Sequence, residues 1–260
     1  MKKNYLRGVL GIPYFLFLLI FVVAPVLILV YYAFTNGSGE FSLENFLLFF
    51  SDQKAIGTLI YSAMIAVVTT IVCLLIAYPV AYILAKGNFR RGNVLLMLFV
   101  MPMWINFTLR ITALKEILTM IEGNLAFHPF INTIIGMTYD FLPFMILPIY
   151  NTIVKIDQSY IEAALDLGAK SYRVFLKIIL PLSVPGIISG ITMVLLPSMT
   201  NYVVLDMMYN STYIMGSLVG SYFNMYDWNN GSVISMILLI LILLLSTITG
   251  EFTEKEDSYE

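Results

Sequence analysis

A dense cluster of charged side chains lies in residues 162–181, EAALDLGAKSYRVFLKIILP, between two apolar stretches. The spacing predicts two short helices, the first over about 158–167 and the second over 171–180, which ends at Pro181. The charged residues of the cluster are Glu162, Asp166, Lys170, Arg173 and Lys177. Such a segment could lie as an amphipathic helix on lipid headgroups, or it could bind another protein.

Small residues in the first helix favour a protein partner. Ala163 and Ala164 would let a second protein approach the backbone closely, and Gly168 is well placed as the cap that ends the helix. Acidic residues beside the apolar face, such as Glu162, argue in the same direction. We therefore interpret residues 158–180 as a docking segment.

A second set of side chains could bind a cation inside a membrane. Asp140 is the one charged residue of the apolar window 132–154, and Trp104 lies in the apolar window 93–112. On ideal helices both would lie near the middle of a hydrocarbon core about 30 Å thick. Carboxylates and aromatic faces suit an ammonium group. The alternatives are a structural hydrogen bond for Asp140 and plain packing for Trp104.

Tyr202 and Asp206 extend this cation-binding set. They are four residues apart, so a helix would place them on one face at the outer end of its span. Asn106 is a weaker candidate, because an ideal helix turns it away from the tryptophan two residues earlier. We expect Arg110 to pair with an acid or with a receptor protein, because a cation would not line a path for cations.

Other classes of site find no support in the sequence. The one cysteine, Cys73, excludes an internal disulfide, and the one histidine, His128, has no neighbouring ligands for a metal. There is no Ser/His/Asp arrangement in the apolar stretches and no Gly-x-x-x-x-Gly-Lys-Ser/Thr loop for ATP. The net charge of −2 argues against nucleic-acid binding, which requires an excess of basic residues. We therefore expect a protein that is not an enzyme and holds no cofactor or metal of its own.

The composition indicates that membrane helices must position these residues. The chain is 60% hydrophobic and only 12% charged, whereas soluble domains are about a quarter charged. We predict an all-α membrane protein with one transmembrane domain, residues 1–250, and an acidic tail, residues 251–260. Its six transmembrane helices are predicted at about 9–34, 58–85, 93–112, 132–154, 184–205 and 231–250.

The distribution of basic residues predicts the orientation of these helices. With both termini in the cytoplasm, eleven of the 14 lysines and arginines lie on the inner side, as the positive-inside rule requires. The outer segments then keep only Lys54, Arg110 and Lys115, and the docking segment is cytoplasmic. In the fifth span, the motif GIISG at 186–190 is a small-xxx-small packing signal.

The docking segment resembles the signature of permease subunits of bacterial ABC importers. That signature is Glu-Ala-Ala, three residues, Gly, nine residues, then Ile-x-Leu-Pro. Its fixed positions are all present, as Glu162, Ala163, Ala164, Gly168, Ile178, Leu180 and Pro181. The resemblance implies the type I ABC importer permease fold, with residues 158–180 as coupling helices that dock onto an ATPase subunit. That ATPase, not this chain, would bind ATP and magnesium.

Further stretches, including YDFLPFMILPIYNTI and VLLPSMTNYVVLDMM, resemble the spermidine/putrescine branch of these permeases. The resemblance covers nearly all of residues 5–250. It implies a bacterial inner-membrane protein in lipid, partnered by a second, non-identical permease, two ATPase copies and an extracellular or periplasmic polyamine-binding protein.

The candidate pathway residues would be Trp104, Asn106, Asp140, Tyr202 and Asp206. Seven acidic residues against three basic ones on the outer side also favour a polycation. An importer half for another small solute, an intramembrane enzyme and a stand-alone channel are the alternatives. An enzyme would need catalytic residues, and the sequence shows no such set in the apolar stretches. A stand-alone channel would leave the docking segment unexplained.

Overall fold

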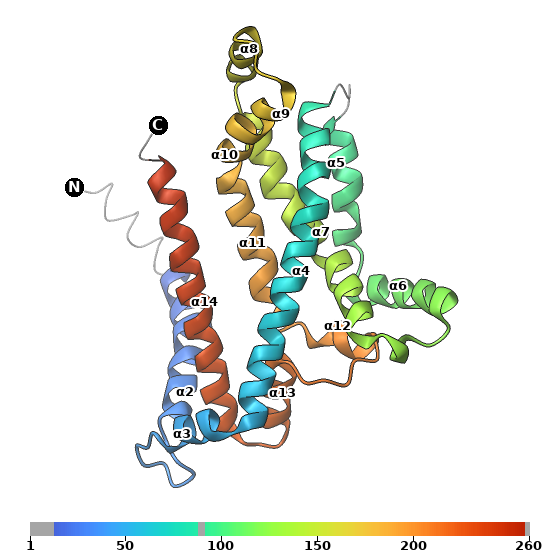
Figure 1. Cartoon of the computed structure of the whole chain (residues 1–260). Coiled ribbons are helices and arrows are strands. Elements are labelled where there is room, and N and C mark those ends of the chain that lie inside the picture. The colour runs from blue at the N-terminus through green and yellow to red at the C-terminus, as the bar shows by residue number, and fades with distance from the viewer. Residues whose placement is uncertain (1–12, 88–91, 258–260) are drawn as a thin grey trace, which may run out of the picture. The chain divides into compact units, whose positions relative to one another are not determined.

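The computed structural model describes residues 13–87 and 92–257 (Figure 1). These residues are helical almost throughout, and the only β pairing among them is an isolated antiparallel bridge between Thr35 and Phe41. The first helical run, Pro13–Ala33, includes a π-helical segment, Leu19–Val23, and α2, Ala24–Ala33. The further helices are α3 Glu44–Ser51, α4 Gln53–Lys86, α5 Gly92–Val100, α6 Phe107–Glu122, α7 Pro129–Lys155, α8 Gln158–Asp166, α9 Ser171–Val174, α10 Leu180–Leu182, α11 Val184–Ser198, α12 Tyr202–Met207, α13 Met215–Asn224 and α14 Trp228–Asp257. The chain forms two compact units, which are described separately.

Unit 1 comprises the residues up to 59 together with 217–241. An asparagine at the start of α14 ties this unit together. The Asn229 side-chain amide donates hydrogen bonds to the backbone carbonyls of Tyr32 at 3.0 Å and Thr35 at 2.5 Å. These carbonyls lie at the end of α2, where the helix leaves backbone acceptors without partners of its own.

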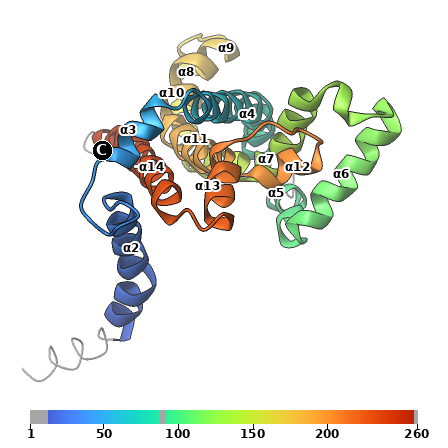
Figure 2. The same ribbon diagram turned by 90° about the horizontal axis from the view of Figure 1, so that it is seen from below.

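Unit 2 comprises residues 60–216 and the chain from 242 onward, and its core is built around α7. Figures 1 and 2 both show α4, α7 and α11 running side by side. The GIISG motif explains the close packing of α11 on α7. A Cβ at Gly186 would approach Thr152 Oγ1 to 2.5 Å, and one at Gly190 would approach Met145 Sδ to 2.6 Å. Only glycine lets the two helices meet at this distance.

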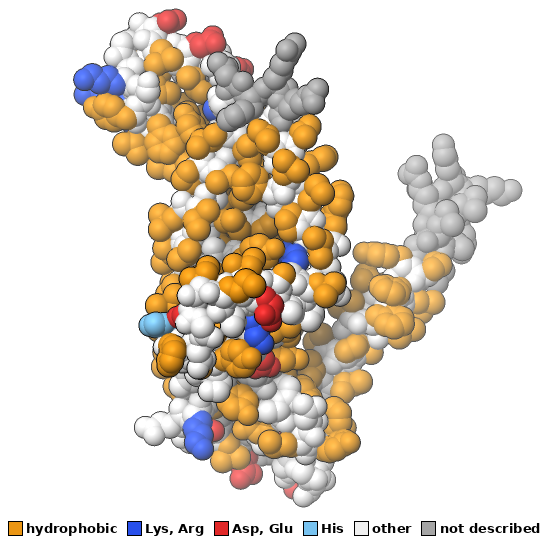
Figure 3. Space-filling model, turned by 90° about the vertical axis from the view of Figure 1, so that its right-hand side faces the viewer, with side chains coloured by type: hydrophobic (Ala, Val, Ile, Leu, Met, Phe, Trp, Pro, Cys, Tyr) orange, Lys and Arg blue, Asp and Glu red, His pale blue; other side chains and the backbone are white. Residues whose placement is uncertain are grey.

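The outer surfaces of the long helices are apolar. On α4 one face exposes a row of large side chains at helical spacing, namely Ile60, Met64, Val67, Ile71 and Leu75. Figure 3 shows continuous areas of hydrophobic side chains on the surface. A soluble protein would not expose so much apolar surface, so this face is suited to lipid or to a partner chain.

Three helices in the described part of the chain are long and apolar enough to cross a membrane: Pro13–Ala33, Gln53–Lys86 and Pro129–Lys155. Two bent pairs raise this number to five if each pair is one span. They are Val94–Trp104 with Phe107–Glu122, and Ser171–Leu182 with Val184–Ser198. Trp228–Leu244 is a shorter apolar helix.

The window predicted as the third span, 93–112, is not one straight helix. After α5 the chain passes through a 3₁₀ turn, Met101–Trp104, and α6 then runs at 100° to the preceding helix. Pro102 lies in that turn, and the Asn106 side chain accepts hydrogen bonds from the backbone of Thr108 at 2.9 Å and Leu109 at 3.4 Å. An asparagine cap starts a new helix, which explains why the direction changes here.

The window predicted as the fifth span, 184–205, also differs. Helix α11 ends at Ser198, directly after Pro197, and three residues separate it from the short helix α12. Tyr202 and Asp206 therefore belong to α12 and do not extend α11. A charge-free window cannot distinguish one helix from two helices joined by a turn.

Candidate functional site

The docking segment folds as two helices joined by a tight turn. Asp157 caps the start of α8, because its carboxylate accepts a hydrogen bond from the Ser159 backbone at 2.9 Å. The hydrogen bonds from Ser159 lower the pKa of the Asp157 carboxyl, since they stabilise its ionised form. The carboxylate also lies at the positive end of the α8 dipole.

Gly168 ends α8 with a φ of +80°, which confirms the prediction of a glycine cap. The Gly168 amide donates to the Leu165 carbonyl at 2.8 Å, and the Ala169 amide donates to the Ala164 carbonyl at 3.0 Å. These two bonds form a Schellman motif, whose left-handed residue is usually glycine. The second predicted helix, 171–180, is continuous to Leu182 and includes a π-helical segment, Phe175–Ile179.

The signature residues of α8 point in different directions. Glu162, Ala163 and Gly168 are exposed, and Glu162 forms no ion pair within the described residues. Ala164 is half-buried and packs, together with Ile161, against a small core of Ile156, Val174 and Ile179. The segment thus has one face that holds it in place and one that is free for a partner.

The docking segment is fixed to the end of α4. Lys86 Nζ donates a 2.9 Å hydrogen bond to the Ile156 carbonyl, where α7 ends. The rings of Tyr78 and Tyr82 pack edge-to-face on Phe175, and the hydroxyls of Tyr78 and Ser183 share a 2.9 Å hydrogen bond. A displacement of this segment must therefore act on α4 as well.

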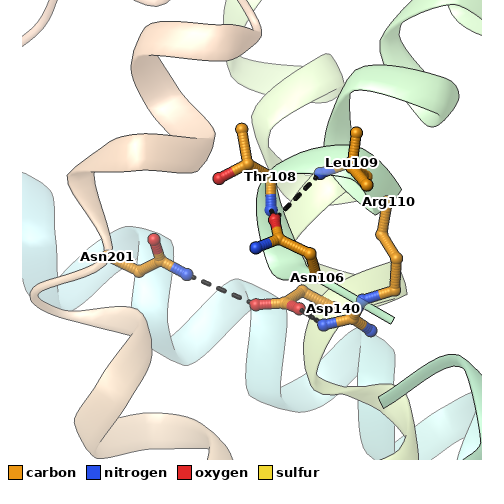
Figure 4. Close-up of polar contacts among 6 residues, drawn as sticks. All are labelled: Asn106, Thr108, Leu109, Arg110, Asp140 and Asn201. Atoms are coloured by element: carbon orange, nitrogen blue, oxygen red, sulfur yellow. Dashed lines mark hydrogen bonds and ion pairs between the residues drawn. The ribbon is translucent and has the colours of Figure 1, made fainter. Parts of the chain in front are cut away.

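Asp140 forms a buried ion pair, which corrects its predicted role as a pathway residue open to a cation. Arg110 Nη2 donates a 2.6 Å hydrogen bond to Asp140 Oδ1, and only 7% of Arg110 and 5% of Asp140 are exposed. Asn201 donates a 3.4 Å hydrogen bond to Asp140 Oδ2 (Figure 4). The guanidinium neutralises the carboxylate, so Asp140 holds α6 and the turn after α11 against α7. The expectation that Arg110 pairs with an acid is confirmed.

The remaining predicted pathway residues lie on different elements. Trp104 is 81% exposed at the end of its 3₁₀ turn. Tyr202 and Asp206 are exposed on α12, and Asp206 forms no ion pair among the described side chains. Asn106 acts as the helix cap described above, so its side-chain oxygen is occupied. The structure places Tyr202 and Asp206 on one helix, α12, and Asn106 at the start of another, α6.

Two asparagines that sequence reasoning overlooked hold the turns around α12. Besides Asn201, the buried Asn210 donates 3.0 Å hydrogen bonds to Tyr61 Oη and Thr133 Oγ1. The signal was an amide side chain within an apolar stretch, which must find a partner when it is buried. In the described part of the chain, no three His, Cys, Asp or Glu residues gather to hold a metal ion.

Comparison with known proteins identifies similar sequences along most of the chain. The family profile for binding-protein-dependent transport system inner membrane components matches residues 77–252. The spermidine/putrescine transport system permease protein PotB of Haemophilus influenzae is 34% identical over 254 residues, covering 89% of this chain and 88% of that protein. PotB of Escherichia coli K12 is 35% identical over 221 residues, covering 79% and 80%. A PotB homolog of Mycoplasma pneumoniae is 30% identical over 232 residues, covering 85% and 79%.

Solved structures show the same fold. A bacterial alginate ABC transporter, in complex with an alginate-pentasaccharide-bound periplasmic protein, matches with a TM-score of 0.72 at 14% identity, covering 98% of this chain and 96% of that one. The inward-facing MetNI methionine ABC transporter matches with a TM-score of 0.60 at 17% identity, covering 78% and 98%. At these identities the likeness concerns the fold.

Proposed function

The chain belongs to the family of binding-protein-dependent transport system inner membrane components, and we propose that it is the permease subunit of an ATP-driven importer of polyamines. It is a multi-pass protein of the bacterial inner membrane and a transport component. One observation carries the proposed substrate: relatives named as spermidine/putrescine permeases are 34–35% identical to it along most of both chains.

In this proposal the exposed face of α8 docks onto an ATPase subunit. Glu162, Ala163 and Gly168 form that face, with the half-buried Ala164 beneath it. ATP would close a pair of ATPase subunits and displace α8, and the contacts of Lys86 and the α4 tyrosines would pass the displacement to the long helices. This motion would turn the permease from inward-facing to outward-facing. ATP and magnesium belong to the ATPase in this scheme.

The proposed path for the polyamine uses exposed acid and aromatic side chains. Asp206 and Tyr202 lie four apart on α12, where a carboxylate and a ring could bind an ammonium group together. Trp104 is a further exposed ring. A second, non-identical permease chain would supply the opposite wall, and a polyamine-binding protein would deliver the substrate.

We propose that the chain crosses the membrane six times with both termini in the cytoplasm. The bent pair α5–α6 then counts as the third span, the fifth begins with α11 while α8 to α10 stay in the cytoplasm, and α14 is the sixth. The excess of basic residues on the side of α8 supports this orientation. Residues 1–250 form the transmembrane domain in this proposal, and 251–260 the acidic tail.

Uptake by the reconstituted complex tests the function. Proteoliposomes that contain both permeases and two ATPase copies, supplied with the binding protein, should accumulate labelled spermidine or putrescine only when ATP is present inside. Robust ATP-dependent uptake of another small solute without polyamine uptake would refute the proposed substrate. The assignment of the chain as an importer permease would then still hold.

The contribution of Asp206 can be tested in the same vesicles. Asp206→Asn keeps the shape of the side chain and removes its charge. A charge-assisted hydrogen bond contributes about 1.5–3 kcal/mol. Because Asp206 is exposed, its contribution should be at the lower end of this energy range. Uptake should therefore fall about tenfold, while basal ATP hydrolysis stays unchanged. Glu116→Gln, at an exposed acid on α6, is the control and should leave uptake at the wild-type rate. Equal uptake by both variants would remove Asp206 from the path.

A further inference from the structure

Unit 1 contains a cavity of about 210 Å³ that none of the sites above uses. It lies between α3, the start of α4, α13 and the start of α14, whose positions Figure 1 shows. Its walls are Leu48, Phe49, Asp52, Ala55, Tyr222, Asn230, Val233 and Ile234. A cavity of this size exceeds what one water molecule or a bare ion requires. We call it the amine pocket, for the reasons that follow.

The amine pocket combines an apolar wall with an unneutralised carboxylate. Phe49, Val233 and Ile234 are buried, whereas Asp52 is exposed at the rim. One oxygen of Asp52 accepts a hydrogen bond from the Lys54 backbone at 2.9 Å, which caps α4. Within the described residues no lysine or arginine pairs with Asp52, so its charge remains available to a ligand.

The tyrosine of the pocket, Tyr222, lies in the field of two acids. Burial raises the pKa of the Tyr222 phenol, and the negative charges of Asp52 and Asp227 raise it further. Asp227 is held by Asn230, whose side-chain amide donates a 2.8 Å hydrogen bond to Asp227 Oδ2. The pocket therefore places a ring and negative potential beside an apolar wall, an arrangement that repels anions and attracts a cation with an aliphatic chain.

We propose that the amine pocket binds one ammonium end of a free polyamine, with the nitrogen on Asp52 beside the Tyr222 ring. The methylene groups would lie against Leu48, Phe49, Val233 and Ile234. The identity of the ligand rests on the proposed function. The site is separate from α12 in the sequence and would be a second binding site for the substrate.

Charge-selective cysteine labelling tests the pocket without requiring transport. Leu48 lines the pocket and is 53% exposed, so Leu48→Cys removes little buried contact. The assembled complex for this test carries Leu48→Cys in a background where the buried Cys73 is replaced by alanine. A cationic methanethiosulfonate should label the new thiol about ten times faster than an anionic one, and millimolar putrescine should slow that labelling severalfold.

Two further variants identify the group responsible. Asp52→Asn keeps an oxygen for the cap of α4 but removes the charge that would bind the nitrogen, so the protection by putrescine should disappear and the cation preference should fall severalfold. Glu44→Gln, on the same helix as Leu48 but outside the pocket, removes the same charge and should keep both effects. Equal labelling by the two reagents, or labelling that putrescine does not slow, would overturn the pocket.

Equilibrium dialysis with labelled putrescine, on the complex without the binding protein, gives a second measurement. The affinity of one site should fall about tenfold in Asp52→Asn and stay unchanged in Glu44→Gln. The outcomes separate the two proposals. Pocket binding without polyamine uptake by the wild type would refute the proposed function alone, and uptake without pocket binding would refute the amine pocket alone.

Discussion

Replacing Gly168 by alanine should weaken coupling through backbone strain alone. The residue has a φ of +80°, and a Cβ added there would meet nothing within 4 Å. The cost therefore comes from the left-handed conformation, which is unfavourable for a residue with a Cβ by about 1–2 kcal/mol. This free energy raises the population of an opened cap at the end of α8 by a factor of about 5–30.

Two matched variants separate strain from surface contact. Gly123 ends α6 with a φ of +78° and also has no atom within 4 Å of an added Cβ, so Gly123→Ala introduces the same strain far along the chain from the docking segment. Gly168→Asn does the reverse. Asparagine tolerates the left-handed conformation, so this change adds bulk to the exposed surface with little strain.

The assay is the number of polyamine molecules imported per ATP hydrolysed in proteoliposomes, together with amide hydrogen exchange. Gly168→Ala should accelerate exchange in the last turn of α8 by about 5–30-fold and lower the import ratio. Gly168→Asn should leave exchange near the wild-type rate and still lower the ratio, because the side chain would enter the docked interface. Gly123→Ala should change exchange in α6 only. A Gly168→Asn complex that couples like the wild type would refute the docking role of this surface.

Three other results are expected. Arg110→Ala leaves the Asp140 carboxylate buried without its partner and should destabilise the complex by about 3–5 kcal/mol, whereas Arg110→Met with Asp140→Leu should be far closer to the wild type in thermal unfolding. A double variant as unstable as the single one would contradict the ion-pair account. Trp104→Ala should lower polyamine uptake by the equivalent of about 0.5–2 kcal/mol with basal ATP hydrolysis unchanged, and unaltered uptake would assign the ring to packing. In a background without the native cysteine, Ser42→Cys should react only with reagents outside the cell and Lys170→Cys only with those inside, and the reverse pattern would overturn the proposed orientation.

The parts of the fold that sequence predicts well are those that local chemistry determines. The cap at Gly168 follows from a glycine after an apolar periodicity, and the spacing of Gly186 and Gly190 signals that some helix packs closely on α11, although it does not say which. Helix α7 covers its predicted window because a long apolar run with a proline at its start has few alternatives. Each of these inferences uses only neighbours within one or two turns.

The parts that sequence predicts poorly depend on contacts between distant residues. The turn between α5 and α6 needs the Asn106 cap and also the reach of Arg110 to Asp140, thirty residues away. Asp140 looked open to a cation because no window can reveal that its partner is already present in the chain. For α12, the partner of Asn201 lies 61 residues away in the sequence, so the break in the fifth window could not be located from charge alone.

The division of α8 into a held face and a free face has a consequence for the evolution of these importers. Ile161 and Ala164 face the small core beneath the helix, while Glu162 and Ala163 face outward. In the proposed docking, substitutions on the outward face would alter which ATPase the permease accepts, and they would leave the internal packing untouched. A gene for this chain could thus adopt a different energy-supplying subunit through a few point changes, while the selectivity of its transport path, encoded elsewhere, is inherited intact.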